Sequence, residues 1–487
     1  MTSNCSNYGL LIDGELRAAE HGAIFEVNDP ATESVVATVA RASIADLEAA
    51  VLAARNAFDK GPWPRLAPFA RGRVLQGIAD GIRGRFDELA ELETSCGGKT
   101  LANSRNEVDA SARVFEYYAG AADKFFGNTI PMGTDVLDFT LREPIGVVAQ
   151  ITPWNFPLLA ASWKTAPALA CGCTIILKPA SHTPITSLIL GQIALAAGLP
   201  AGVLNVLPGP GRELGNTIAR HPLVNKIAFT GETRTGAELM KQSADDIKRV
   251  SLELGGKSPN IVFSDADLDK AAGAAVSGGF GNAGQSCSAR TRLFVERSVL
   301  EEFTERFATA TEQFRVGDPM SDDINMGPLI SNSSWQTVKG YVEGAVVEGA
   351  TVLCGGDRPV DLPQGHYFSP TILAHATNDM QAVREEIFGP VVAVIPFDDE
   401  TDAIAMANDN EYGLNASVWS RDIGKALRVA RALQCGMVSV NSHGSASRYG
   451  LFAPFGGQKK SGLGRELSMR ALELYTEEKN IFIDHSD

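Results

Sequence analysis

Short apolar runs alternate with helical patterns through the middle of the chain. The runs of strand length are residues 145–151, 174–177, 204–207 and 226–229. The helical patterns that follow them reach residue 170 and then cover 185–197, 213–220 and 237–244. Parallel strands need such crossovers, so the pattern predicts a doubly wound parallel sheet, an α/β fold.

A second alternating region extends from Pro259 to Asn441 and predicts a second α/β unit. Its strand-like runs are 259–263, 291–295, 351–353, 391–395, 416–419 and 437–440. Near the end of the chain, residues 480–484 alternate apolar and polar after a charged helical pattern. This strand has no later element to cover it. We expect it either to complete a sheet in a neighbouring subunit or to form an edge strand of its own chain.

Length and composition fit two large domains plus a small element. Apolar residues make up 44% of the chain and charged residues 21%, an ordinary globular balance. The 43 basic and 58 acidic residues leave a formal charge of −15, which disfavours nucleic acid and anionic membranes as partners. We find no apolar run of membrane-spanning length, and residues 1–11 show no secretory signal.

The seven cysteines are an odd number scattered along the chain, which indicates a reducing cytoplasm rather than a disulfide framework. Cys171 and Cys173 form the one close pair, without a second pair or a histidine nearby. Because a zinc site needs more ligands, we interpret them as small buried residues and expect no metal.

Three loops are candidates for binding an anionic cofactor. Gly231 and Gly236 bound a turn between a strand and a helix, where free N–H groups attract phosphate. Their spacing departs from Gly-x-Gly-x-x-Gly, so the motif alone is weakly specific. Lys178 ends another strand, at the edge where doubly wound sheets bind ligands, with a solvated surface lysine as the alternative. The loop from Gly209 also misses the fingerprint, and we expect ligand contact only at its Gly209 end.

Three segments carry residues that could act on a carbonyl group. Cys287 lies among glycine and serine residues, which leave a thiol open and place backbone N–H groups near it. Glu253 precedes a Gly-Gly pair that would let it swing, and its apolar neighbours would raise its pKa toward that of a general base. Two prolines hold Asn155 rigid, as an oxyanion donor requires. The structural alternatives are an inert buried cysteine, a surface glutamate and an Asx turn.

Together these motifs resemble the aldehyde dehydrogenase superfamily. The matching positions, in chain order, are Asn155, Lys178, Gly231–Gly236, Glu253, Cys287, residues 385–390 and residues 454–466. The separation of 34 residues between Glu253 and Cys287 also matches the family. The resemblance extends from about Asn28 to the C-terminus.

The resemblance implies a reaction and a role for each residue. Cys287 would attack the aldehyde, and Asn155 with the Cys287 backbone N–H would hold the oxyanion. Hydride would pass to the nicotinamide of NAD or NADP and leave a thioester on Cys287. Glu253 would activate the water that releases the acid, and could first take the thiol proton. Lys178 would belong to both the catalytic set and the cofactor site.

The resemblance also implies a cofactor site, in which Glu386 holds the nicotinamide ribose and Phe388 packs near it. The cofactor residues would be Ile151, Thr152, Pro153, Trp154, Lys178, Ala180, Ser181, Gly209, Gly211, Phe229, Thr230, Gly231, Glu232, Leu254, Gly255, Glu386 and Phe388. The aldehyde tunnel would be lined by Ala110, Ala160, Trp163, Ser286, Ser288, Tyr449 and Phe455.

Three structural units follow from the same resemblance. They are an NAD(P)-binding domain of residues 1–123 and 144–254, an α/β catalytic domain of residues 255–455, and a small β oligomerisation arm of residues 124–143 and 470–487. The arm joins subunits in the family, so we expect a homodimer or homotetramer and favour intersubunit pairing of the last strand.

One position departs from many NAD-preferring relatives. They carry a glutamate three residues after the lysine, where it binds the adenosine ribose, and this chain has Ser181. A carboxylate there would repel a 2′-phosphate and a serine would not, so we expect both NAD and NADP to be used. The alternative is that Ser181 only caps the next helix and NAD is preferred.

Two features bear on the substrate. Glu253 predicts hydrolysis to a free acid, since relatives that transfer the acyl group to coenzyme A tend to lack this carboxylate. Ala110 and Ala160 beside Trp163 and Phe455 predict a roomy apolar tunnel for aromatic, terpenoid or longer aliphatic aldehydes.

The sequence also bears on two other substrate classes, semialdehydes and amino-aldehydes, and on a non-catalytic protein of the same fold. Arg448 could bind a carboxylate and make the substrate a semialdehyde. Amino-aldehydes would need acidic residues at the tunnel mouth, and the sequence assigns none there. A non-catalytic structural or binding protein on the same fold would not need Asn155, Glu253 and Cys287, and their presence argues against it.

Overall fold

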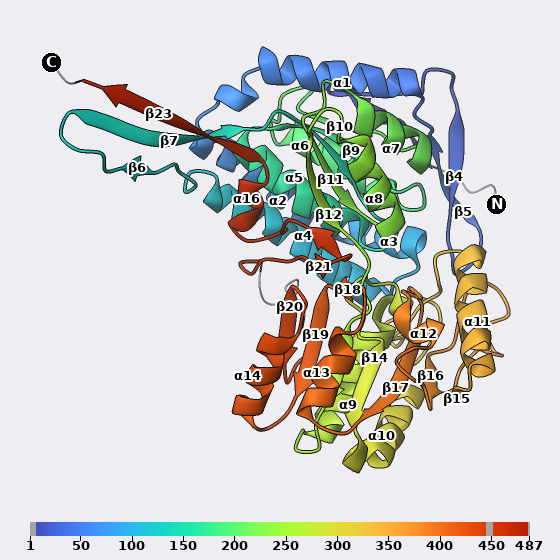
Figure 1. Cartoon of the computed structure of the whole chain (residues 1–487). Helices are drawn as coiled ribbons and strands as arrows, with labels where there is room; N and C mark the ends of the chain where they lie inside the picture. The colour runs from blue at the N-terminus through green and yellow to red at the C-terminus, as the bar shows by residue number, and fades with distance from the viewer. Residues whose placement is uncertain (1–5, 445–450, 486–487) are drawn as a thin grey trace.

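Two large sheets form the body of the molecule, one above the other in Figure 1, and a small sheet projects from its upper left. The computed structural model describes residues 6–444 and 451–485. Within them, no helix is both long and apolar enough to cross a membrane. The same residues contain no group of three or more His, Cys, Asp or Glu side chains that could hold a metal ion.

The first sheet has eight strands in the order β22-β12-β11-β8-β9-β10-β2-β3. Their bounds are Gly462–Leu463, Arg249–Glu253, Lys226–Thr230, Val147–Ile151, Thr174–Lys178, Leu204–Val206, Leu10–Ile12 and Glu15–Arg17. The strands from β12 to β10 are parallel, and the edges on both sides are antiparallel. The predicted doubly wound sheet is therefore confirmed, with β12 as a strand that the apolar pattern did not reveal.

The crossover helices of this sheet are α5 (Pro157–Cys171), α6 (Ile185–Ala196), α7 (Gly211–Arg220) and α8 (Thr233–Gln242). Every residue of β8 and β9 is buried, as expected for parallel strands covered on both faces. The remaining helices of this half are α1 (Ile44–Asp59), η1 (Trp63–Arg65), α2 (Pro68–Gly84), α3 (Phe86–Gly97) and α4 (Leu101–Ala121). A separate three-stranded sheet contains β1 (Ser6–Tyr8), β5 (Val35–Ala40) and β4 (Ile24–Asn28).

Helix α8 begins at Thr233, four residues before the predicted start at Ala237. Gly236 therefore lies inside the helix and not in the turn. A Cβ added at Gly236 would come within 2.5 Å of the Leu254 side chain, so the glycine allows close packing of α8 against the chain after β12. Helix α7 likewise begins earlier than predicted, at Gly211.

The second sheet has seven strands in the order β15-β16-β17-β14-β13-β19-β20, all parallel except β15. Their bounds are Thr351–Cys354, Thr371–Ala374, Val391–Phe397, Arg292–Glu296, Pro259–Val262, Asn415–Trp419 and Met437–Val440. The sequence predicted six of these strands and missed β16. The helices of this half are α9 (Leu268–Phe280), η2 (Gly281–Gly284), η3 (Arg297–Val299), α10 (Leu300–Glu312), α11 (Asn332–Val347), α12 (Gln381–Arg384), α13 (Glu400–Asn408) and α14 (Ile423–Ala432). A two-stranded sheet joins β18 (Tyr412–Gly413) to β21 (Gln458–Lys459).

The projecting sheet consists of β6 (Thr129–Ile130), β7 (Val136–Pro144) and β23 (Thr476–Asp484), with β7 in the middle (Figure 1). The last strand is longer than predicted, and α16 (Arg470–Glu473) is the only helix directly before it. The charged segment expected to be helical is thus partly extended, because it pairs along the whole of β7. β23 is an edge strand of its own chain, and its pairing with a neighbouring subunit stays a prediction.

The register of the first sheet brings distant segments to one edge. Ile151 lies opposite Lys178, and Thr230 lies opposite Glu253. All four residues are at the carboxyl ends of parallel strands, where open α/β sheets bind their ligands.

Candidate active site

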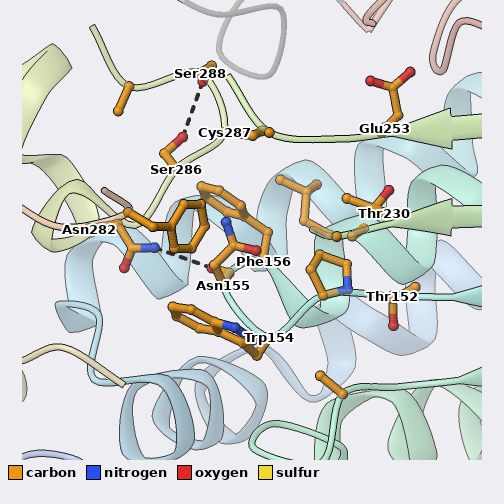
Figure 2. Close-up of a pocket in the computed structure, with 18 of the residues that line it drawn as sticks. Thr152, Trp154, Asn155, Phe156, Thr230, Glu253, Asn282, Ser286, Cys287 and Ser288 are labelled. Carbon is orange, nitrogen blue, oxygen red and sulfur yellow. Dashed lines mark hydrogen bonds between the residues drawn. The ribbon is translucent and has the colours of Figure 1, made fainter. Parts of the chain in front are cut away.

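A cavity of about 1240 Å³ begins at this carboxyl edge and is lined by described residues from both halves of the chain. Figure 2 shows Cys287, Glu253 and Asn155 around the same pocket, with Asn155 below the loop Ser286–Ser288 in this view. The predicted residues that line the cavity are Ala110, Ile151, Thr152, Pro153, Trp154, Asn155, Ala160, Trp163, Lys178, Ala180, Ser181, Gly211, Phe229, Thr230, Gly231, Glu232, Glu253, Leu254, Gly255, Ser286, Cys287, Ser288, Glu386, Phe388 and Phe455.

Gly209 is the exception among the described candidates. It does not line the cavity, whereas Gly211 does, and contact of either glycine with a ligand stays a prediction. A Cβ added at Gly209 would lie 2.7 Å from the Leu214 side chain and close to the Ala42 backbone, which shows that this glycine packs inside the fold. Two other candidates, Arg448 and Tyr449, lie outside the described residues.

The loop Ser286–Ser288, called the cysteine loop from here on, follows a turn of unusual backbone conformation. Asn282, Ala283 and Gly284 have φ angles of 53°, 55° and 69°, in the left-handed region that non-glycine residues rarely adopt. The Gln285 side chain holds the turn, since its Nε2 donates to the Asn282 carbonyl at 3.1 Å and its Oε1 accepts the Ile330 N–H at 2.8 Å. These contacts fix the chain just before Cys287.

The Cys287 thiol is half-buried and protonated at neutral pH. Burial raises its pKa to about 12, and the charges of Glu386 and Glu253 add to this shift. The backbone N–H groups of Cys287 and Ser288 face the sulfur and act in the opposite direction. The thiol therefore needs a base to become a nucleophile, and the two N–H groups are available to negative charge at this point.

Asn155 connects the two halves of the site. Its side-chain Nδ2 donates to the Gln285 carbonyl at 3.0 Å, and its backbone carbonyl accepts from Asn282 Nδ2 at 3.4 Å (Figure 2, dashed line). An amide nitrogen carries two hydrogens, so one N–H remains for a ligand. The side chain is 5% exposed and held from both ends, which suits a donor that must not reorganise.

Glu253 ends β12 with both carboxylate oxygens buried and without a hydrogen-bond partner among the described residues. Burial raises its pKa well above the ordinary value, and the neighbouring Glu466 carboxylate raises it further. The cations of Lys164 and Arg465 counteract part of this shift. Lys164 and Glu466 form a buried ion pair beside Glu253. The carboxyl group can thus exchange a proton closer to neutral pH than a surface glutamate.

The Gly255–Gly256 pair lies in the irregular segment between β12 and β13, and neither glycine has a positive φ angle. That the pair lets Glu253 swing stays a prediction. A Cβ at Gly255 would collide with the Glu386 carboxylate, and one at Gly256 would collide with the Cys287 carbonyl oxygen. The pair therefore lets the end of β12 approach both the cysteine loop and Glu386 closely.

At the other end of the cavity, Lys178 and Ser181 lie near the start of α6. Burial lowers the pKa of Lys178 to about 8, which keeps most of the ammonium charged at neutral pH. Its one hydrogen bond among the described residues goes to the Pro179 carbonyl at 3.1 Å, and no carboxylate in that part of the chain pairs with it. Ser181 Oγ donates to the Gly209 carbonyl at 2.9 Å instead of capping the helix.

Glu386 and Phe388 form the wall between these two ends. Glu386 Oε1 accepts the Gly256 N–H at 3.0 Å, and burial raises its pKa to about 7. The Phe388 ring meets Trp154 edge to face, with centroids 5.4 Å apart. Both rings line the cavity.

The opposite wall is made by one face of α4 and one face of α5. Ala110, Leu159, Ala160 and Phe455 are each less than 10% exposed, and the Trp163 ring lies 4.9 Å from that of Phe455. These five side chains form an apolar stretch of the wall.

Acidic residues, which the sequence did not assign to the tunnel, also line this wall. Glu107 and Asp109 precede Ala110 on α4 and both border the cavity. The Asp109 side chain is 51% exposed and lies 3.7 Å from the Arg113 guanidinium, so its charge is partly balanced.

His182, which the sequence places next to Ser181, also lines the cavity. Sequence reasoning did not assign the remaining wall residues, which are Asn103, Asn106, Arg113, Phe156, Leu159, Ser277, Gly278, Gly281, Asn282, Ala289, Arg290, Ser333, Ser334, Thr337, Ile387, His443 and Glu466. Helical spacing from Ala110 and Trp163 could have found those on α4 and α5. The three residues of α11 have no local signal that sets them apart.

Comparisons with known proteins agree on one family. The model of the aldehyde dehydrogenase family matches residues 17–481. A betaine aldehyde dehydrogenase of Bacillus subtilis (strain 168) is 44% identical over 476 residues, which cover 97% of this chain and 96% of that protein. The putative aldehyde dehydrogenase DhaS of the same organism is 41% identical over 479 residues, covering 98% and 96%.

Solved structures lead to the same family. An NAD-dependent aldehyde dehydrogenase from Sinorhizobium meliloti has a TM-score of 0.97 and 40% identity, over 99% of this chain and 95% of that one. A betaine aldehyde dehydrogenase from Staphylococcus aureus, in complex with NAD+, has a TM-score of 0.96 and 40% identity, with the same coverage. The chain belongs to the aldehyde dehydrogenase family, and the predicted resemblance is confirmed. It is an oxidoreductase that acts on an aldehyde group.

Proposed function

We propose that this enzyme oxidises an aldehyde to the free carboxylic acid through a thioester on Cys287. The observation that carries the proposal is the shared cavity of Cys287, Asn155 and Glu253. It combines a nucleophile, a rigid hydrogen-bond donor and an unpaired carboxylate of raised pKa. A hydrolytic acyl transfer needs these three groups.

The residues present fit a bound nicotinamide dinucleotide, NAD or NADP. The hydroxyls of Thr152 and Thr230 are buried at the cavity without a partner among the described residues, and Lys178 has no counter-ion there. Lys178 with the start of α8 would hold phosphate, and the Glu386 carboxylate would accept from a ribose hydroxyl. When bound, the cofactor supplies a hydride acceptor.

In the first half of the reaction, Glu253 takes the Cys287 thiol proton. The thiolate forms a C–S bond to the aldehyde carbon, and the C=O electron pair moves to oxygen. Asn155 Nδ2 and the Cys287 backbone N–H stabilise that oxyanion until hydride leaves and the thioester forms. Glu253 then passes the thiol proton to solvent, which leaves its carboxylate free to act again.

In the second half, Glu253 takes a proton from water, whose oxygen attacks the thioester carbon. The C–S bond breaks, the acid leaves, and the Cys287 thiolate takes back the proton from Glu253, which restores the thiol for the next cycle. Because Glu253 has no hydrogen-bond partner among the described residues, it can reach a water molecule without breaking an existing bond.

We expect NADP to be used within about tenfold of NAD in kcat/KM, because a neutral Ser181 near Lys178 does not repel a 2′-phosphate. Ser181→Glu should lower kcat/KM for NADP more than about tenfold and leave NAD little changed. Ser181→Ala, which removes the bond to Gly209 but no charge, is the matched control and should keep NADP use. An NAD preference above about tenfold in the unaltered enzyme contradicts this expectation.

We further propose that the substrate carries an apolar remainder, such as an aromatic, terpenoid or longer aliphatic group. The support is the apolar wall of Ala110, Leu159, Ala160, Trp163 and Phe455. The second candidate is an aldehyde with an ammonium group, favoured by Asp109 and Glu107 on the same wall and by the two relatives named betaine aldehyde dehydrogenase.

A panel of aldehydes, read by absorbance of the reduced nicotinamide, decides between the two. We expect aromatic and longer aliphatic aldehydes to give the highest kcat/KM. Ala160→Leu should lower kcat/KM for these bulky substrates by roughly tenfold, because the larger side chain takes up space in the cavity. The value for acetaldehyde should be little changed. If a trimethylammonium aldehyde gives the highest value, and Asp109→Asn lowers that value alone, the second candidate is correct.

A further inference from the structure

A buried ion cluster contacts the backbone carbonyl of Asn155. Lys99, in the turn between α3 and α4, is 2% exposed. Its ammonium donates to Glu93 Oε2 at 3.4 Å, to Glu107 Oε2 and to the Asn155 backbone carbonyl at 2.9 Å. It also lies 5.0 Å from the centre of the Phe156 ring. All three hydrogens of the ammonium are therefore used, one of them on the proposed oxyanion donor.

The Glu93 carboxylate ties this cluster to two helices. Its Oε1 accepts the Thr186 hydroxyl of α6 at 2.6 Å and the Leu158 N–H in the first turn of α5 at 3.2 Å. Glu93 is 1% exposed, so these bonds satisfy a carboxylate that water does not reach. The charge of Lys99 is thus held in place relative to the start of α5, which follows Asn155 directly.

The turn that carries Lys99 is fixed from its other side as well. The Leu101 N–H donates to the Pro319 carbonyl at 2.8 Å. Gly98 has a φ of 74°, and a Cβ there would lie 2.8 Å from Pro30 and 2.9 Å from Pro328. These contacts fix the backbone of the turn through groups other than Asn155, so the root of the Lys99 side chain does not depend on Asn155 for its position.

Three contacts therefore hold Asn155. Lys99 Nζ and Asn282 Nδ2 donate to its backbone carbonyl at 2.9 and 3.4 Å, and the Gln285 carbonyl accepts one of its two side-chain N–H groups. With both ends fixed, the second N–H has one direction left. A donor for a developing oxyanion works best when it is held in its final direction before the charge appears.

We propose that Lys99, held by Glu93 and Glu107, is a positioning residue that fixes Asn155 as the oxyanion donor. The inference rests on the oxyanion role of Asn155 that is part of the proposed function. It assigns a function to three charged residues of which only Glu107 reaches the cavity wall.

A double-mutant cycle of Lys99→Met and Asn155→Ala tests this inference, with the single-turnover rate of nicotinamide reduction as the readout. Asn155→Ala should lower this rate roughly 100- to 1000-fold. As a single substitution, Lys99→Met should lower the single-turnover rate about tenfold or more, since displacement of a catalytic group by about 1 Å has effects of this size. In the Asn155→Ala background, the same Lys99→Met change should lower it less than about twofold.

The controls separate positioning from simple loss of structure. Lys99→Arg keeps the charge and should retain more of the rate than Lys99→Met. Lys248→Met removes another buried lysine that pairs with a carboxylate, Asp246, away from the cavity, and should leave the rate unchanged. If Lys99→Met does not fold, Glu107→Gln takes its place in the cycle. As a single substitution it should lower the rate roughly threefold or more, and combined with Asn155→Ala it should add a loss of less than about twofold.

Two results would overturn the inference while leaving the proposed function intact. One is an equal fold-loss from Lys99→Met with and without Asn155, and the other is an unaltered rate in folded Lys99→Met. An unaltered rate in Asn155→Ala would overturn both the inference and the oxyanion site of the proposed function.

Discussion

Cys287→Ser is expected to lower kcat for aldehyde oxidation by at least about 10⁴-fold, the scale seen when a covalent nucleophile is removed. A serine hydroxyl is far less acidic than a thiol. Burial and the charges of Glu386 and Glu253 already raise the pKa of Cys287 to about 12, and the same surroundings would oppose an alkoxide even more. The measurement is steady-state reduction of the nicotinamide with a saturating aldehyde.

A matched control is Cys435→Ser. Among the described residues, Cys287, Cys354 and Cys435 are the half-buried free thiols, and of these only Cys287 lines the cavity. Its kcat should stay within about twofold of the unaltered enzyme. Alkylation of one thiol per subunit should abolish activity in step with labelling of Cys287. Activity that survives in Cys287→Ser would refute covalent catalysis, and an inactive unaltered chain would favour the non-catalytic alternative.

Glu253→Gln is expected to leave the first turnover detectable and to slow later turnovers by roughly 10²- to 10⁴-fold, the usual contribution of a general base. The variant should therefore show a burst of reduced nicotinamide that approaches one per active site. If Glu253 also takes the thiol proton, the burst is slower but keeps the same amplitude. Acid release at the rate of the unaltered enzyme would show that another group activates the water.

The same variant should also change the dependence on pH. Burial and the neighbouring Glu466 raise the pKa of Glu253, so this carboxyl group stays protonated to a higher pH than a surface glutamate does. Only the ionised form can accept a proton, and the rate of acid release should rise as pH rises through this pKa. The rising limb should be absent in Glu253→Gln. A limb that persists unchanged in the variant would belong to another group.

Short segments of unusual composition made Cys287, Glu253 and Asn155 candidates, and the resemblance to the aldehyde dehydrogenase superfamily gave each its expected role. Glycine and serine around a cysteine, or two prolines around an asparagine, are visible without knowledge of the fold. The apolar runs likewise revealed the parallel strands other than β12 and β16, since strands such as β8 and β9 are buried on both faces. Patterns within a few neighbouring residues were thus enough to point to candidate residues and to most of the buried strands.

The missed features depend on contacts between distant segments. Glu93, Lys99 and Glu107 look like ordinary surface charges, and only their mutual pairing allows burial. Strand β22 has two residues and joins the first sheet from more than 200 positions along the chain from β12. Gly236 was assigned to a turn because a glycine that relieves a positive φ and one that allows close packing are identical in sequence.

The covalent step itself can be measured most directly by mass spectrometry of Glu253→Gln, quenched after mixing with an aldehyde and NAD. The account predicts that the peptide containing Cys287 gains the mass of the acyl group, in an amount equal to the reduced nicotinamide formed. The adduct should disappear when hydroxylamine, which cleaves thioesters, is added. Stoichiometric nicotinamide reduction without an adduct on this peptide, or with the adduct on another residue, would contradict the central claim.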